Sequence, residues 1–164
     1  MCTGPSPTKR RFERRDRSGT AGHRPFYVDA DVLGLAKILV TIRADVTFPG
    51  DPGGVIHRRQ RPACPITSTS TPDEIWIPET ARRGWVIITR DSRIQHHRAE
   101  IRAVQASGAR MIALAGIDAG GTWEQLETLM NQWRAIEKRV DEPGPFIYTA
   151  TRTTLRPVEL TKRP

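Results

Sequence analysis

Three aspartates occupy positions that a parallel sheet would bring to one edge. Asp29 follows the apolar run Phe26–Val28, and Asp91 closes the polar tripeptide that ends a second apolar run at residues 85–88. Asp73 opens the predicted helix before that second run. Such a helix runs antiparallel to the strand after it, so its first residue meets the carboxyl ends of the strands, where open α/β sheets bind ligands. Three converging carboxylates would repel one another without a cation, and oxygen ligands favour a hard divalent metal such as Mg²⁺.

Each acid also has an ordinary structural explanation. A carboxylate in the first turn of a helix is favoured by the helix dipole, which by itself accounts for Asp73. Asp29 and Asp91 could be turn residues at the ends of strands. The expected convergence of all three on one edge is what favours a metal site over three unrelated turns and caps.

The middle of the chain predicts a helix followed by a strand that is buried on both faces. Thr71 and Glu74 have the spacing of a capping box, and Pro72 suits the first helical position. Gly84 is expected to end the helix, and the uninterrupted apolar run after it is typical of a central parallel strand. Pro78 is expected to kink or split the helix.

The same alternation of strands and helices continues on both sides. Strands are predicted at residues 26–29, 45–48 and 111–115, helices at 32–43, 92–107 and 122–139, and a strand or irregular hairpin from residue 146. In the last helix, Thr122 and Gln125 suggest a second capping box. An apolar stripe in that helix is expected to pack in the core: Trp123, Leu126, Met130, Trp133 and Ile136. The alternation predicts a three-layer α/β/α sandwich with a mainly parallel central sheet.

Basic residues suggest where an anionic partner could bind. Residues 49–72 are rich in proline and glycine and predict a long structureless loop, a kind that is usually functional or mobile. The basic residues of that loop are His57, Arg58, Arg59 and Arg61. Contact with a substrate or partner and plain solvation are both open for them. Arg93 and Arg98, just past Asp91, are better placed for phosphate, because guanidinium pairs bidentately with phosphate oxygens.

Composition bounds the remaining possibilities. The chain has 164 residues and a formal charge of +8, and residues 1–25 hold seven Lys/Arg against two acids. These residues predict a disordered basic tail, either a solvated arm or a nucleic-acid contact, ahead of a single domain at residues 26–160. Cys2 and Cys64 give no disulfide framework, which fits a reducing cytoplasm. No apolar stretch is long enough to cross a membrane.

Three segments together resemble the PIN domain: FYVDAD at the first strand, PDEIWIPETARRGWVIITRD in the middle and GARMIAL after it. The pattern is most similar to the compact branch found among bacterial toxin–antitoxin ribonucleases of the VapC type, over about residues 26–118. The resemblance implies an Mg²⁺- or Mn²⁺-dependent endoribonuclease with Asp29, Asp73 and Asp91 as catalytic metal ligands, the last oriented by Thr89. It also implies an RNA substrate and a small antitoxin partner, and it allows a homodimer.

Two other functions stay open. The usual second acid of that family, a glutamate, has no clear match, since beyond the Asp-x-Asp of residues 29–31 only Asp45 and Asp51 are acidic between the first strand and the middle helix. A PIN-shaped module that binds RNA or protein through a degenerate metal site is therefore an alternative. The Asp-x-Asp of residues 29–31 also resembles haloacid-dehalogenase-like phosphatases, but Leu33 and the lack of a late Asp-Asp pair argue against that class.

Overall fold

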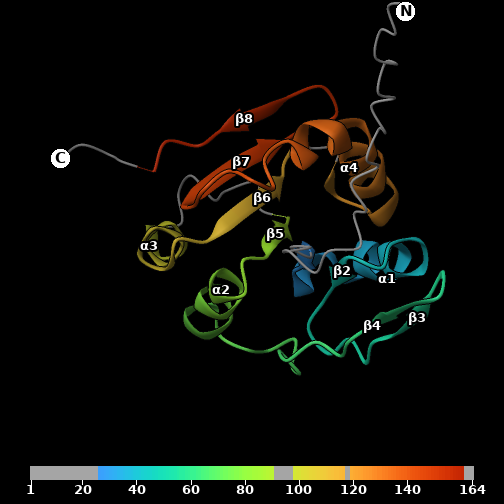
Figure 1. The fold of residues 1–164 in the computed structure, drawn as a ribbon. Coiled ribbons are helices and arrows are strands. Elements are labelled where there is room, and N and C mark those ends of the chain that lie inside the picture. Colours follow the sequence, from blue (N-terminus) through green and yellow to red (C-terminus); the bar gives the residue numbers. More distant parts are fainter. Residues whose placement is uncertain (1–25, 91–97, 117–118, 161–164) are drawn as a thin grey trace, which may run out of the picture.

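A six-stranded sheet forms the centre of the computed structural model, which describes residues 26–90, 98–116 and 119–160 (Figure 1). The strands follow the order β2-β1-β5-β6-β7-β8, in which only β8 runs antiparallel to its neighbour. Their bounds are β1 Phe26–Val28, β2 Val46–Thr47, β5 Val86–Thr89, β6 Arg110–Leu114, β7 Phe146–Ala150 and β8 Leu155–Pro157. The mainly parallel α/β sheet predicted from the sequence is confirmed.

Two pairs of helices cover opposite faces of the sheet (Figure 1). The helices are α1 Leu33–Ile42, α2 Asp73–Arg82, α3 Arg98–Ser107 and α4 Thr122–Glu137. In β5, Val86 and Ile88 pack with α1 and α4, whereas Ile87 packs with α2 and α3. Because the strand is buried on both faces, it needs apolar residues at every position, which explains its unbroken run. No helix in the described ranges is long and apolar enough to cross a membrane.

The ends of α2 differ in part from the sequence prediction. The predicted capping box is wrong, because the Thr71 hydroxyl donates to the carbonyl of Ser68 and Pro72 is the N-cap. Gly84 has φ +70°, the left-handed conformation that ends helices, so the predicted stop is confirmed. The helix is not split at Pro78, since α2 continues without a break from Asp73 to Arg82.

Helix α4 buries a different stripe from the predicted one. Trp123 and Met130 are 73% and 58% exposed, so their assignment to the core is wrong. The buried residues of α4 are Gln125, Thr128, Leu129, Gln132 and Ile136. The two glutamines can be buried because their amides donate to the carbonyls of Ala119 and Arg152. The capping box predicted for α4 is also wrong, because Gly121 is the N-cap and makes no side-chain cap bond.

The segment predicted to be a structureless loop contains a β-hairpin, β3 (Gly54–Ile56) with β4 (Arg59–Arg61). Its two-residue turn consists of His57 and Arg58, which have φ values of 47° and 63°. Such turns suit the twist of a hairpin but usually contain glycine, asparagine or aspartate, so the sequence gives no ordinary turn signal here. The prediction failed for that reason.

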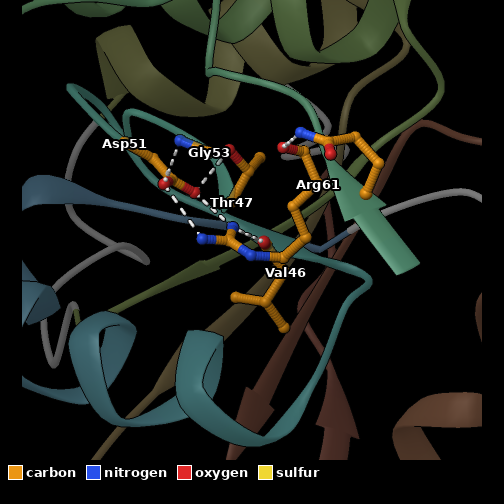
Figure 2. Close-up of polar contacts among 6 residues, drawn as sticks. Val46, Thr47, Asp51, Gly53 and Arg61 are labelled. Atoms are coloured by element: carbon orange, nitrogen blue, oxygen red, sulfur yellow. Dashed lines mark hydrogen bonds and ion pairs between the residues drawn. The ribbon is translucent and has the colours of Figure 1, made fainter. Parts of the chain in front are cut away.

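A buried ion pair fixes the base of this hairpin (Figure 2). The Arg61 guanidinium donates to both carboxylate oxygens of Asp51, at 2.5 and 3.1 Å, and to the carbonyl of Val46 at 2.9 Å. Asp51 also accepts from the backbone N–H of Gly53 at 2.9 Å. Gly53 has φ +77°, and a Cβ there would lie 2.5 Å from the Arg61 carbonyl oxygen, so only glycine fits. The hairpin is thus attached to edge strand β2 by side chains as well as by the chain.

Candidate active site

Asp29 is fixed at the carboxyl end of β1 by three hydrogen bonds. Its backbone N–H donates to the carbonyl of Ile88 at 2.9 Å, which continues the β1–β5 ladder by one residue. Its Oδ1 accepts from the N–H of Ala30 at 2.6 Å, and its Oδ2 accepts from the hydroxyl of Thr89 at 3.1 Å. The first of the side-chain bonds caps the short 3₁₀ helix Ala30–Val32. The side chain is therefore held in one orientation beside β5.

A second carboxylate, Asp31, lies beside the same hydroxyl. Thr89 Oγ1 is 3.3 and 3.4 Å from the two Asp31 oxygens, and the N–H of Arg90 is 3.1 and 3.3 Å from them. One hydroxyl has one proton, so Thr89 cannot donate to Asp29 and Asp31 at the same time. Thr89 was expected to orient Asp91, but its described contacts are with these two acids.

Asp73 lies at the first position of α2, and its Oδ1 accepts from the indole N–H of Trp76 at 2.9 Å. Together with Asp29 and Asp31 it lines a hollow of about 230 Å³ at the carboxyl edge of the sheet. Glu100, in the first turn of α3, lines the same hollow. The remaining lining residues are Trp76, Ile77, Thr89, Arg90 and Met111.

Sequence reasoning named two of these four acids as site residues. Asp31 and Glu100 were missed, although each had a signal. Asp31 stands two residues after Asp29, in the short Asp-x-Asp motif that the 3₁₀ turn folds back onto β5. Glu100 is the acid in the first turn of a helix that leaves the same sheet edge. Asp91 directly follows Arg90 and lies outside the described residues.

The hollow disfavours negative charge. Burial raises the pKa of Asp29, and the nearby Asp73 carboxylate raises it further, against the hydrogen bonds from Ala30 and Thr89. Burial and the neighbouring Asp29 raise the pKa of Asp31 to about 7. The Arg90 guanidinium opposes this effect on Asp31. Its Nη1 donates to the carbonyl of Gly120 at 3.0 Å, which holds this cation at the wall of the hollow.

Carboxylate oxygens that repel one another in a partly desolvated hollow suit a hard divalent cation. Within the described ranges, however, no three His, Cys, Asp or Glu side chains are arranged to hold a metal ion. Asp29 and Asp73 are the predicted ligands that the structure places in the hollow. Mg²⁺ or Mn²⁺ fits the chemistry of these oxygen donors.

The other acids weighed as ligands have structural partners instead. Asp45 pairs with Arg43 at 2.6 Å, and Asp51 pairs with Arg61 below the hairpin. Neither of these aspartates lines the hollow. The missing second acid of the sequence pattern is therefore not supplied by either residue.

The predicted phosphate contacts are spread over three places. Arg98 is exposed at the first position of α3, and Arg93 lies outside the described residues. Arg58 and Arg59 are exposed on the hairpin and do not line the hollow. Arg90, which does line it, was not singled out from the sequence.

The raised pKa of Asp31 predicts a pH-dependent stability. Folded Asp31 keeps its proton up to about pH 7 and the unfolded residue only to about pH 4, so this group makes folding less favourable as pH rises between those values. Although its carboxylate is partly desolvated, Asp31 as a whole residue is exposed, so solvent screening reduces the effect to about 1 kcal/mol. Urea unfolding without divalent metal at about pH 5 and about pH 8 should show this loss, and Asp31→Asn should lack it. An identical pH profile in Asp31→Asn would contradict the prediction.

Comparisons with known proteins agree with this architecture. A family model described as "PIN like domain" matches residues 26–116, more than half of the chain. A protein of Mycobacterium tuberculosis (strain ATCC 25618 / H37Rv), named "Putative ribonuclease VapC45", is 35% identical over 81 residues. The match covers 49% of this chain and 57% of that protein, so it spans little more than half of the relative. No solved structure matches the chain significantly.

Proposed function

The chain belongs to the PIN-like domain family, and from this premise we propose that it is a metal-dependent endoribonuclease. One observation carries the proposal: Asp29, Asp31 and Asp73 line one hollow at the carboxyl edge of the sheet, where burial and neighbouring carboxylates raise the pKa values of Asp29 and Asp31. The two buried aspartates outside the hollow, Asp45 and Asp51, are paired with arginine, whereas the described residues include no such ion pair for the three aspartates of the hollow. A cluster without such pairing is the kind that a functional cation compensates.

Each side chain has a separate task in this proposal. Asp29, Asp73 and Asp91 would hold Mg²⁺ or Mn²⁺, which when bound lowers the pKa of a water and neutralises charge on the scissile phosphate. Thr89 fixes the direction of the Asp29 carboxylate by donating to its Oδ2. Arg90, at the wall of the hollow, offers a cation to a phosphate oxygen.

The attacking group in this proposal is water. Among the described residues that line the hollow, Thr89 has the only hydroxyl, and that hydroxyl already lies between two carboxylates. No serine or cysteine, which are more common nucleophiles, occurs among the described residues that line the hollow. A single-stranded RNA suits a hollow at a sheet edge, because its backbone is exposed and can be bent into the site.

The biological role we propose is that of a toxin in a toxin–antitoxin pair. The relative from Mycobacterium tuberculosis is named a ribonuclease of the VapC type, and the resemblance of the chain to that type supports an antitoxin partner. Arg98, at the first position of α3, and Arg93, five residues before it in the sequence, would then serve RNA binding. A homodimer is compatible with this role.

Incubation of end-labelled single-stranded RNA with the purified protein tests the proposal. Cleavage should require Mg²⁺ or Mn²⁺ and stop on addition of EDTA, and calorimetry should detect metal binding. RNA binding without cleavage, together with no detectable metal binding, would instead identify a degenerate PIN module. The lack of a clear match in the sequence for the second acid of the family is the observation that favours this second function.

A further inference from the structure

We propose that the β3–β4 hairpin is a rigid basic finger that binds phosphates of the RNA outside the cleavage site. The inference rests on the proposed ribonuclease function and adds a second contact region for the same substrate. The finger is defined as residues 54–61, with the exposed cations Arg58 and Arg59 and the exposed His57 at its tip. We define the carboxylate hollow described above as the cleavage site.

Charge is the first argument. The finger contains three arginines and one histidine, and no acidic residue occurs between Asp51 and Asp73. Of the arginines, only Arg61 is buried and used in the structural ion pair. Arg58 and Arg59 have no ion pair among the residues that the structure describes. Two exposed guanidinium groups therefore remain for an external anion, which they can bind bidentately.

Rigidity is the second argument. A solvated loop does not need a buried ion pair, yet the finger is attached by the bonds of Arg61 to Asp51 and to the carbonyl of Val46 (Figure 2). His57 and Arg58 in the turn have positive φ. This backbone conformation does not by itself favour histidine or arginine, so the turn geometry does not explain why cationic residues occur there. Because a pre-ordered contact loses less entropy on binding, a fixed finger binds phosphate more effectively than a flexible loop.

Position is the third argument. Strand β2 pairs in parallel with β1, so Thr47 at its end lies at the same sheet edge as Asp29. The Asp51–Arg61 pair contacts Val46 and Thr47, so the finger starts from that edge, one strand away from the cleavage site. From this placement of its base we infer that an RNA strand long enough to span both regions contacts the cleavage site and the finger together.

The finger should contribute to binding and leave the chemical step unchanged. In Arg58→Ala/Arg59→Ala, KM for a single strand of about 16 nucleotides should rise about tenfold at low salt while kcat stays constant. A dinucleotide bound at the cleavage site lacks the flanking phosphates that the finger would contact, so its cleavage should be unaffected. For binding of the long strand to the non-cleaving Asp29→Asn protein, the slope of log K against log salt concentration should become about 1.4 units shallower when both arginines are removed, as expected for two phosphate contacts.

Two control variants show whether the change in RNA binding depends on the cations of the finger or on the net charge of the protein. Arg134→Ala/Lys138→Ala removes two exposed cations at the far end of α4, near the amino edge of the sheet, and should leave the salt slope unchanged. Arg58→Lys/Arg59→Lys keeps both charges and should retain most of the slope. Thermal melts of all variants check that the fold is intact.

The possible outcomes distinguish the two proposals. If the wild-type protein cleaves RNA and the finger variant keeps the wild-type KM and salt slope, the finger is not an RNA contact, although the ribonuclease function stands. If the finger variant binds RNA normally but loses an acidic protein partner, the finger is a protein-docking element and the inference is wrong. If the wild-type protein binds RNA with the finger-dependent slope but never cleaves it, the binding inference holds and the nuclease function fails.

Discussion

Replacing Asp29 by asparagine should lower the rate of RNA cleavage by about a thousandfold or more. Asp29 is the most constrained acid of the hollow, with bonds to Ala30 and Thr89 and a backbone bond to Ile88. Asparagine has the same shape but no charge, so it would weaken metal binding and the electrostatic support of the reaction. Loss of about 4 kcal/mol of such support corresponds to that factor in rate. Initial rates at saturating Mg²⁺ measure it.

The same variant should not lose stability. Without metal, removing one of several repelling carboxylates should raise the unfolding midpoint of Asp29→Asn slightly above that of the wild-type protein. Asp141→Asn removes an exposed carboxylate outside the hollow and serves as the control for both measurements. An Asp29→Asn protein that is folded and fully active would remove Asp29 from the catalytic site.

Parallel variants assign the remaining acids. Asp73→Asn and Asp91→Asn should abolish cleavage as Asp29→Asn does, because both are proposed ligands. Asp31→Asn is the informative comparison, since Asp31 shares the Thr89 hydroxyl with Asp29 and was not expected from the sequence pattern. If its rate falls as far as that of Asp29→Asn, Asp31 takes the place of the missing second acid. If its rate is kept, its role is to position Thr89.

The parts of the fold that follow from local rules were predictable from the sequence. The buried run at β5 needs apolar residues on both faces, and Gly84 supplies the left-handed residue that ends α2. Asp29 and Asp73 could be placed at one edge because strand ends and helix starts meet there in any parallel α/β sheet. These features depend only on the direction of neighbouring strands and helices, so they could be predicted without knowledge of the strand order.

The parts that depend on long-range partners were not predictable. Gln132 is buried in α4 because the carbonyl of Arg152, 20 residues away in the chain, accepts from its amide, and no periodicity of apolar residues can indicate that. Asp31 joins the site through Thr89, which is 58 residues away in the chain. The β3–β4 hairpin depends on the pairing of Asp51 with Arg61, at a separation of ten residues that gives no motif.

That pair gives the largest expected effect on stability. The side chains of Arg61 and Asp51 are only 8% and 1% exposed, so neither charge is compensated by water. Arg61→Met should lower the free energy of unfolding by about 3–5 kcal/mol, because it leaves a buried carboxylate without its partner. Urea unfolding followed by circular dichroism measures the loss. Arg82→Met breaks the exposed pair with Glu79 and should leave the free energy unchanged within error.

A double-mutant cycle separates the ion pair from simple loss of packing. Asp51→Asn keeps an oxygen that can accept from the N–H of Gly53, so it removes the charge while retaining that backbone bond. If the buried charges stabilise each other, Asp51→Asn/Arg61→Met should be less destabilised than the sum of the single variants, with a coupling energy of about 3 kcal/mol. Additive losses would show that each side chain acts through its own contacts, Arg61 through the Val46 carbonyl and Asp51 through Gly53. In that case the hairpin would be held by separate bonds to the edge strand, and removal of either charge would not release it.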